Sequence, residues 1–317
     1  MALRALPAAA ALVLSVCGCS RGGADTDPGS IADTPTSSAE FVESEGSRST
    51  STAVPPSMSS STSTTPPAAS STTVPLTTTT TTTTLPTLAS AGFDRSNIPS
   101  DAPVIFGESV RGTPLTVIRH GERNGARLLL VGSIHGDEDA GIAIVHALME
   151  RDVPEGVELW LVPSMNPDGN TLQQRHNANG VDLNRNFPHR WAPLAEPGNW
   201  QYAGPAPASE PETAAMVALG ELVNPDLVLW YHQDLFRISP TGGRNGEIRA
   251  LYAEISGLPL LQVTGGTYTG TASMWSRTVT TSDGTGFTVE LGPSLSDEQL
   301  EAHVSAVLAV AEQFYAS

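Results

Sequence analysis

A short apolar segment, residues 127–134, runs directly into the polar turn His135-Gly-Asp-Glu138, and this junction constrains the fold of the chain. The apolar segment has the length and composition of a strand that is buried on both faces of a sheet. After the turn, apolar residues recur at the spacing of one helical face over residues 140–148. The turn therefore holds an imidazole and a carboxylate three residues apart, a pair that can fill two positions of a zinc site. The pattern is weak by itself, so the rest of the chain must supply its context.

The composition divides the 317 residues into three parts. Residues 1–19 contain one Arg, an apolar run and a Val-Cys-Gly-Cys box that ends at Cys19, which indicates a secretion leader with lipidation of Cys19. An ordinary cleaved signal remains the alternative, because the box has a Cys at its second position. Residues 20–100 are dominated by Ser, Thr, Pro, Ala and Gly, and such a segment buries too little apolar surface to fold. We predict a disordered stalk there, followed by one domain over residues 101–317.

The charged and sulfur-containing residues exclude several kinds of chemistry. A net charge of −17 argues against nucleic acid and against an anionic membrane surface as partners. All 16 basic residues are Arg, so a lysine nucleophile and a Schiff base are excluded. Both cysteines, Cys17 and Cys19, lie in the leader, so a metal site in the folded domain must use His and carboxylate ligands.

Strand-like and helix-like segments alternate after residue 101. We expect strands at residues 115–120, 127–134, 157–162, 226–231 and 286–290. We expect helices at residues 140–148, 209–223 and 247–256 and from residue 296 onward, with capping boxes at Ser209 and Ser296. The long loop between residues 164 and 208 is expected to be functional. This alternation predicts an α/β fold, with a mixed, mostly parallel central sheet and helices on both faces.

Three predicted strands end at a side chain that can do chemistry, namely His135, His232 and Glu290. Open α/β sheets bind ligands beyond the carboxyl ends of their strands. Each of these residues alone has an ordinary structural explanation, as a hydrogen-bonded side chain at the end of a strand. Their arrival at the same edge of one sheet, together with Glu138, favours a single site.

The long loop resembles the zinc metallocarboxypeptidases of the carboxypeptidase A type. The resemblance is carried by Asn166-Pro-Asp-Gly169, by Arg175 and by the run Asn177-Ala-Asn-Gly-Val-Asp-Leu-Asn-Arg-Asn-Phe-Pro188. The segment Gly204-Pro-Ala-Pro-Ala-Ser-Glu-Pro-Glu-Thr213 is similar to the bacterial branch with murein peptide amidases and γ-D-glutamyl-diaminopimelate peptidases. The resemblance extends from about residue 107 to the C-terminus, and it implies that residues 101–317 form a zinc carboxypeptidase-like catalytic domain.

The resemblance also implies a set of catalytic roles. One Zn²⁺ would be held by His135, Glu138 and His232, which leaves a fourth position for water. Glu290 would act as the general base toward the zinc-activated water, and Arg175 would stabilise the developing oxyanion.

Further residues would bind the substrate or orient a ligand. Asn184 and Arg185 would hold a carboxylate on the leaving side of the scissile amide. Tyr268 lies near the position at which the family places a Tyr over the substrate. Asp182 would orient His135 through the second nitrogen of its ring.

The implied function is zinc-dependent hydrolysis of a peptide amide next to a carboxylate. The expected substrate is a peptidoglycan stem peptide, cut at the γ-D-Glu–diaminopimelate bond. Ser273 and Met274 are expected to line the specificity pocket, and since neither is charged, we expect this wall to offer no ion pair to a substrate side chain. We expect an extracytoplasmic monomer, secreted and attached to the outer face of a bacterial membrane only through a lipid on Cys19.

Two other functions remain open. An N-acyl amino acid deacylase of the aspartoacylase or succinylglutamate desuccinylase kind shares the His-x-x-Glu pattern, an Asp-Leu-Asn-Arg run and a distal His. The longer Asn-Ala-Asn-Gly segment before that run favours a peptidase. A non-catalytic wall-binding lipoprotein is the other alternative, but a binding protein has no need of a base such as Glu290.

Overall fold

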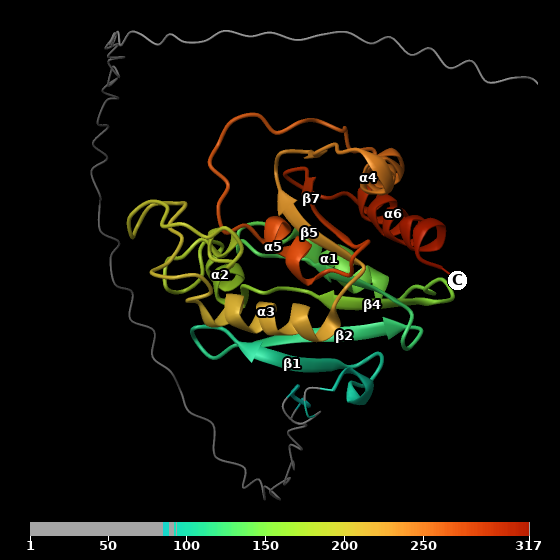
Figure 1. Cartoon of the computed structure of the whole chain (residues 1–317), viewed down its shortest axis with the longest axis horizontal. Helices are drawn as coiled ribbons and strands as arrows, with labels where there is room; N and C mark the ends of the chain where they lie inside the picture. Colours follow the sequence, from blue (N-terminus) through green and yellow to red (C-terminus); the bar gives the residue numbers. More distant parts are fainter. Residues whose placement is uncertain (1–84, 89–91, 93, 317) are drawn as a thin grey trace, which may run out of the picture. The chain divides into compact units, whose positions relative to one another are not determined.

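A computed structural model of the chain describes residues 85–88, 92 and 94–316 (Figure 1). The predicted leader, Cys19 and the predicted stalk as far as residue 84 lie outside the described residues. The predicted boundary at residue 101 needs a correction, because Leu88 and Ile98 are buried in the core of the domain. These two apolar side chains are inconspicuous in a segment rich in Ser and Thr, but they supply the apolar surface that packing requires. Within the described residues, no helix has both the length and the apolar character needed to cross a bilayer.

The described residues form a seven-stranded mixed sheet in the order β1-β2-β4-β3-β5-β7-β6. The strands are β1 (Pro103–Glu108), β2 (Pro114–Gly121), β3 (Ala126–Val131), β4 (Val157–Val162), β5 (Leu227–Gln233), β6 (Arg237–Ile238) and β7 (Thr285–Leu291). The four central strands, β4, β3, β5 and β7, pair in parallel, whereas β1, β2 and β6 form antiparallel pairs toward the two edges. The mixed α/β sheet is thereby confirmed.

Helices cover both faces of this sheet, as predicted. The helices are α1 (Ala140–Leu148), α2 (Pro167–Leu172), α3 (Pro211–Val223), α4 (Gly243–Ser256), α5 (Ala272–Val279) and α6 (Asp297–Phe314). On one face, α1, α4 and α6 pack over side chains such as Leu128 and Leu130, and Figure 1 shows α4 and α6 side by side. On the other face, α3 and α5 pack over Leu129 and Val131. Successive residues of β3 thus alternate between two apolar cores, which explains its continuous apolar sequence.

Only one of the two predicted capping boxes is formed. At α6, the Ser296 side chain accepts from the backbone N–H of Gln299, and the Gln299 side chain accepts from the N–H of Ser296. At α3, the helix begins at Pro211 without a side-chain cap, so the predicted box at Ser209 is wrong. The reason is that Glu212 is fully buried, where it accepts a backbone N–H from the turn between β1 and β2.

A buried chain of hydroxyl and imidazole groups links β5, α4 and α6. The Tyr231 and Tyr252 hydroxyls lie 3.2 Å apart, and the Tyr252 hydroxyl lies 3.0 Å from Nδ1 of His303. Burial lowers the pKa of His303 from 6.5 to about 4. Since the folded state disfavours the imidazolium, His303 stays neutral inside the protein at neutral pH.

This burial predicts a pH-dependent loss of stability. The contribution of neutral His303 is fully present above its unfolded pKa of about 6.5, and it is lost as the pH falls from there toward about 4. The shift corresponds to at most about 3 kcal/mol in the free energy of unfolding. Urea unfolding at pH 7 and pH 4 should therefore show a smaller pH dependence for His303→Gln than for the wild type. Equal pH dependence of the two proteins would contradict this origin of the effect.

Candidate metal centre and active site

The candidate ligands arrive from the carboxyl ends of two neighbouring parallel strands. His135 and Glu138 lie in the turn between β3 and α1, and His232 lies near the end of β5. β7 follows β5 in the sheet, and its Glu290 is the register partner of His232. The structure confirms the predicted convergence of these strand ends. Strand β3 ends at Val131, earlier than the predicted end of that strand.

The turn that carries His135 and Glu138 is fastened by the Asn-Pro-Asp-Gly motif. The Asn166 side chain donates to the backbone carbonyls of Ile134 and Arg175, each at 3.2 Å, and so ties the turn to the long loop. The backbone of Gly136 packs directly on Gly169, because a Cβ added at Gly136 would lie 1.9 Å from the Gly169 carbonyl carbon. The motif that marks the family resemblance therefore has a structural function next to the ligands.

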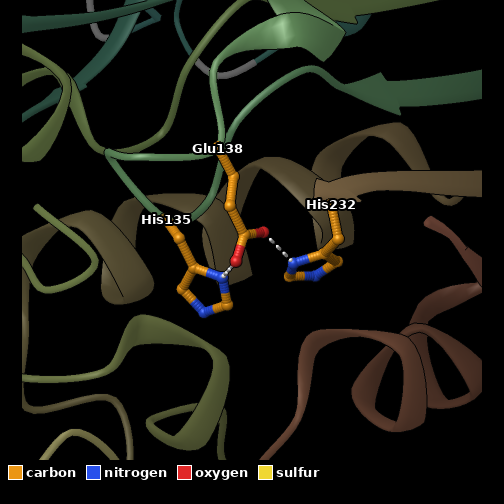
Figure 2. Close-up of side chains that lie close together, drawn as sticks. All are labelled: His135, Glu138 and His232. Atoms are coloured by element: carbon orange, nitrogen blue, oxygen red, sulfur yellow. Dashed lines mark hydrogen bonds and ion pairs between the residues drawn. The ribbon is translucent and has the colours of Figure 1, made fainter. Parts of the chain in front are cut away.

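The Glu138 carboxylate lies between two imidazoles (Figure 2). Its Oε1 is 2.8 Å from Nδ1 of His135, and its Oε2 is 2.7 Å from Nδ1 of His232. One ligand atom from each of the three residues lies within 4.8 Å of the others. Burial disfavours the charge on Glu138, but the His232 and His135 imidazoles outweigh this and hold the pKa of Glu138 well below its usual range.

These side chains fit a zinc ion. Two imidazole nitrogens and one carboxylate are a set of ligands that catalytic zinc sites use, with an open fourth position. His135 is 2% exposed and has a carboxylate beside each ring nitrogen, so its Nδ1 side needs a proton or a metal ion. In the described part of the chain, these are the residues grouped closely enough to hold a metal ion.

Asp182 and Asn184 contact the outer nitrogens of the two imidazoles. Nε2 of His135 lies 3.1 Å from Oδ1 of the fully buried Asp182. An N–H at this nitrogen donates to Asp182 and leaves Nδ1 free for a metal ion. Nε2 of His232 lies 3.3 Å from Nδ2 of Asn184. The structure thus places Asp182 beside His135, where the resemblance predicted it.

The Arg175 guanidinium contacts the carboxylate of Asp182, the residue that also contacts His135. Its Nε and Nη2 donate to Oδ2 of Asp182 at 3.1 and 2.8 Å, and its Nη1 lies 3.4 Å from Oε1 of Glu138. The indole of Trp200 covers the guanidinium, at 5.1 Å from the ring centre. Asp182 therefore holds a guanidinium and an imidazole together at the edge of the site.

Glu290 faces this site without a hydrogen-bonding partner among the described residues. Burial raises the pKa of its carboxyl group, and the nearby Glu138 carboxylate raises it further, whereas His232 and Arg237 oppose the rise. A partly buried carboxylate without a partner is costly, so the arrangement is expected to serve chemistry rather than stability.

Arg185 is a buried cation without a counter-ion among the described residues. It is 4% exposed, its Nη1 donates to the carbonyl of Asn184 at 2.8 Å, and its Nε has no hydrogen-bonding partner. The guanidinium carbon lies 5.6 Å from the centre of the Tyr268 ring, and this ring is about half exposed. Burial lowers the pKa of Arg185, although the Asp182 carboxylate opposes this, and an Arg side chain still remains charged.

One cavity of about 630 Å³ unites the predicted residues. It is lined by His135, Glu138, Arg175, Asn184, Arg185, His232, Tyr268, Ser273, Met274 and Glu290. It is also lined by residues that sequence reasoning missed, including Trp200, Asp234 and Arg237. Arg237 lies in the two-residue strand β6, which is too short to produce a sequence pattern. Ser273 and Met274 line the cavity and carry no charge, whereas Arg237 adds a cation at another part of the lining.

Comparison with known proteins gives a family and a set of relatives. A family model described as zinc carboxypeptidase matches residues 97–234, a range that contains all three ligands but ends before Glu290. Murein peptide amidase A of Escherichia coli (strain K12) is 30% identical over 213 residues, which is 64% of this chain and 86% of that protein. Murein peptide amidase A of Vibrio campbellii is 29% identical over 219 residues, which is 66% of this chain and 86% of that protein.

Solved structures agree on the fold. The murein-tripeptide amidase of Escherichia coli O157 superposes with a TM-score of 0.56 at 28% identity, over 69% of this chain and 94% of that chain. Carboxypeptidase A from Helicoverpa armigera also gives a TM-score of 0.56, at 17% identity, over 67% of this chain and 69% of that chain. The second similarity concerns the fold alone.

Proposed function

Since the chain belongs to the zinc carboxypeptidase family, we propose that it hydrolyses a peptide amide next to a free carboxylate in peptidoglycan stem peptides. The observation that supports the bond type is the buried Arg185, which has no counter-ion among the described residues and lies in the cavity that also holds Glu290 and the three ligands. A guanidinium in this state is suited to a carboxylate, which it can bind through two parallel hydrogen bonds. The similarity to murein peptide amidases supports stem peptides as the source of that carboxylate.

The family's zinc fits the donors of His135, Glu138 and His232, and when bound it supplies a Lewis acid that lowers the pKa of water toward ~7. In the proposed mechanism, a Glu290 carboxylate oxygen accepts a proton from the attacking water and returns it to the leaving nitrogen. Among the described residues, Glu290 has no hydrogen-bonding partner from which it must separate before it takes this proton.

The remaining cavity residues bind and orient the substrate in this proposal. Arg185 holds the substrate carboxylate, and Asn184, whose Oδ1 accepts the N–H of Ala272 at 2.9 Å, keeps a fixed orientation beside it. Tyr268 is exposed enough to cover a bound substrate. Arg175, held by Asp182, presents a fixed positive charge to the oxyanion that develops on the scissile carbonyl.

We further propose an extracytoplasmic monomer that is anchored through a lipid on Cys19. The leader and its Val-Cys-Gly-Cys box support this location, which would give the enzyme access to wall peptides. Mass spectrometry of the protein isolated from membranes tests the proposal, since an unmodified Cys19 would contradict it.

The substrate is tested by incubating the purified full-length protein and zinc with L-Ala-γ-D-Glu-meso-diaminopimelate. We expect release of free diaminopimelate, which a zinc chelator should abolish. Chelator-sensitive cleavage of ordinary L-peptides alone would keep the reaction and reject the wall substrate. Cleavage of acetyl-amino acids alone would favour the deacylase, and no hydrolysis by a folded, zinc-loaded protein would favour a wall-binding lipoprotein.

Arg185→Met is expected to raise KM by roughly 10- to 100-fold, because a charge-assisted contact to the substrate carboxylate is lost. Arg277→Met, on the exposed side of α5, removes the same charge outside the cavity and should leave KM unchanged. Steady-state kinetics of the two variants provide the comparison. A substrate with an amidated C-terminus should be handled equally by the wild type and Arg185→Met, and an equal loss on both substrates would contradict the assigned role.

A further inference from the structure

Arg237 is a second cation of the cavity that the proposed mechanism does not use. It lies in β6, which pairs antiparallel with β7, and its register partner is Glu290. Side chains at directly opposed positions of an antiparallel pair lie on the same face of the sheet. Thr288, two residues before Glu290, shares that face, and all three residues line the cavity.

The Arg237 guanidinium has no partner in the described part of the protein. Its Nε is buried without a hydrogen bond, and its guanidinium forms no ion pair with a carboxylate among the described residues. Glu290 lies close enough for Arg237 to lower its pKa, but the two side chains do not form an ion pair. A half-buried guanidinium in this state is unfavourable unless a ligand supplies an anion.

The three arginines that line this cavity differ in their partners. Arg175 is paired with Asp182, so its donors are largely occupied. Arg185 lies under Tyr268 and serves the substrate carboxylate in the proposed function. Arg237 lies in the edge strand β6, with Glu290 as its register partner, and remains available for a second anionic group.

We propose that Arg237 binds a second carboxylate, at the end of the side chain of the leaving residue. This inference rests on the proposed function, and it assigns the residue that recognises the side-chain carboxylate of the released dicarboxylic amino acid. The exposed Asp234 lines the same cavity and offers an opposite charge to an ammonium group on the same side chain. Arg237 is thus a determinant of specificity and does not take part in proton transfer.

Two peptides that differ only in this carboxylate provide the test. In L-Ala-γ-D-Glu-meso-diaminopimelate, the leaving side chain ends in an ammonium and a carboxylate, whereas in L-Ala-γ-D-Glu-L-Lys it ends in the ammonium alone. We expect the wild type to prefer the first peptide by roughly 10- to 100-fold in kcat/KM. Arg237→Met should lose that preference with little change on the lysine peptide, Arg237→Lys should retain part of it, and Arg277→Met should behave as the wild type.

Two results with these peptides would overturn the inference. An undiminished preference in a folded, zinc-loaded Arg237→Met would show that the carboxylate is bound elsewhere. An equal fall in kcat on both peptides, with a shifted pH profile, would show that Arg237 acts on Glu290 and not on the substrate. If the wild type cleaves neither peptide, the proposed substrate is wrong, and the comparison is repeated with L-peptides that end in Glu and in Gln. A preference for Glu that survives in Arg237→Met would then reject the inference.

Discussion

Glu290→Gln is expected to reduce kcat by roughly 100- to 10,000-fold, the range that positioned general bases contribute. Gln has the shape of Glu but cannot act as a base, and the position affected is the register partner of His232 in the pair of β5 and β7. KM should change little, because the proposed substrate contacts come from Arg185 and Arg237. Steady-state kinetics with the diaminopimelate peptide measure both constants.

The control for this variant is its zinc content and its stability. Glu290 is not one of the three candidate ligands, so the variant should bind zinc as the wild type does. Burial already raises the pKa of Glu290, which means that the folded protein disfavours its charge, and a neutral Gln should leave the unfolding free energy unchanged or increased. Undiminished turnover in a zinc-loaded Glu290→Gln protein would remove Glu290 from the mechanism.

The ends of the central strands could be predicted because their signals are local. The strand that carries His232 is a continuous apolar run, since it pairs in parallel on both sides and is buried on both faces, and a His near its end is conspicuous. In β7, Phe287 and Val289 alternate with Thr288, and Glu290 follows them. The order β3-β5-β7 then brings these ends together without any further information from the sequence. This regularity indicates one site at His135, His232 and Glu290, whereas their roles as ligands and base are implied by the family resemblance.

The missed features depend on contacts between distant parts of the chain. Strand β6 has two residues and exists only because it pairs with β7, so neither its position nor the direction of Arg237 is visible in a local pattern. Ser209 and Glu212 have the spacing of a capping box, but the turn between β1 and β2 uses the Glu212 carboxylate instead. In both places, contacts between distant residues override the local conformational preference of the sequence.

Replacement of a zinc ligand should lower the zinc affinity of the protein more than replacement of a neighbouring residue. Glu138 is the one negative charge among the three candidate ligands, and it contacts both imidazoles. Loss of an outer hydrogen bond to a ligand costs about 10- to 100-fold in metal affinity, so loss of the charged ligand should cost more than ~100-fold. Glu138→Gln keeps the shape of the side chain and should lose both zinc and chelator-sensitive turnover.

Graded variants separate a ligand from its surroundings. Asp182 is not a ligand but contacts His135, Arg175 and the backbone N–H of Asn184, and Glu290 forms no hydrogen bond with the ligands among the described residues. We expect zinc affinity, measured by competition with a chromophoric chelator, to decrease in the order wild type and Glu290→Gln, then Asp182→Asn, then Glu138→Gln. Asp182→Asn should fall by about 10- to 100-fold, because an amide is a weaker acceptor for the His135 N–H than a carboxylate. Excess zinc should restore part of the turnover of Asp182→Asn, in which Arg175 is also held less firmly, but none of the turnover of Glu290→Gln, whose defect lies in the proton transfer. If Glu138→Gln binds zinc as tightly as the wild type, the ion is held elsewhere, and the assignment of this centre is wrong.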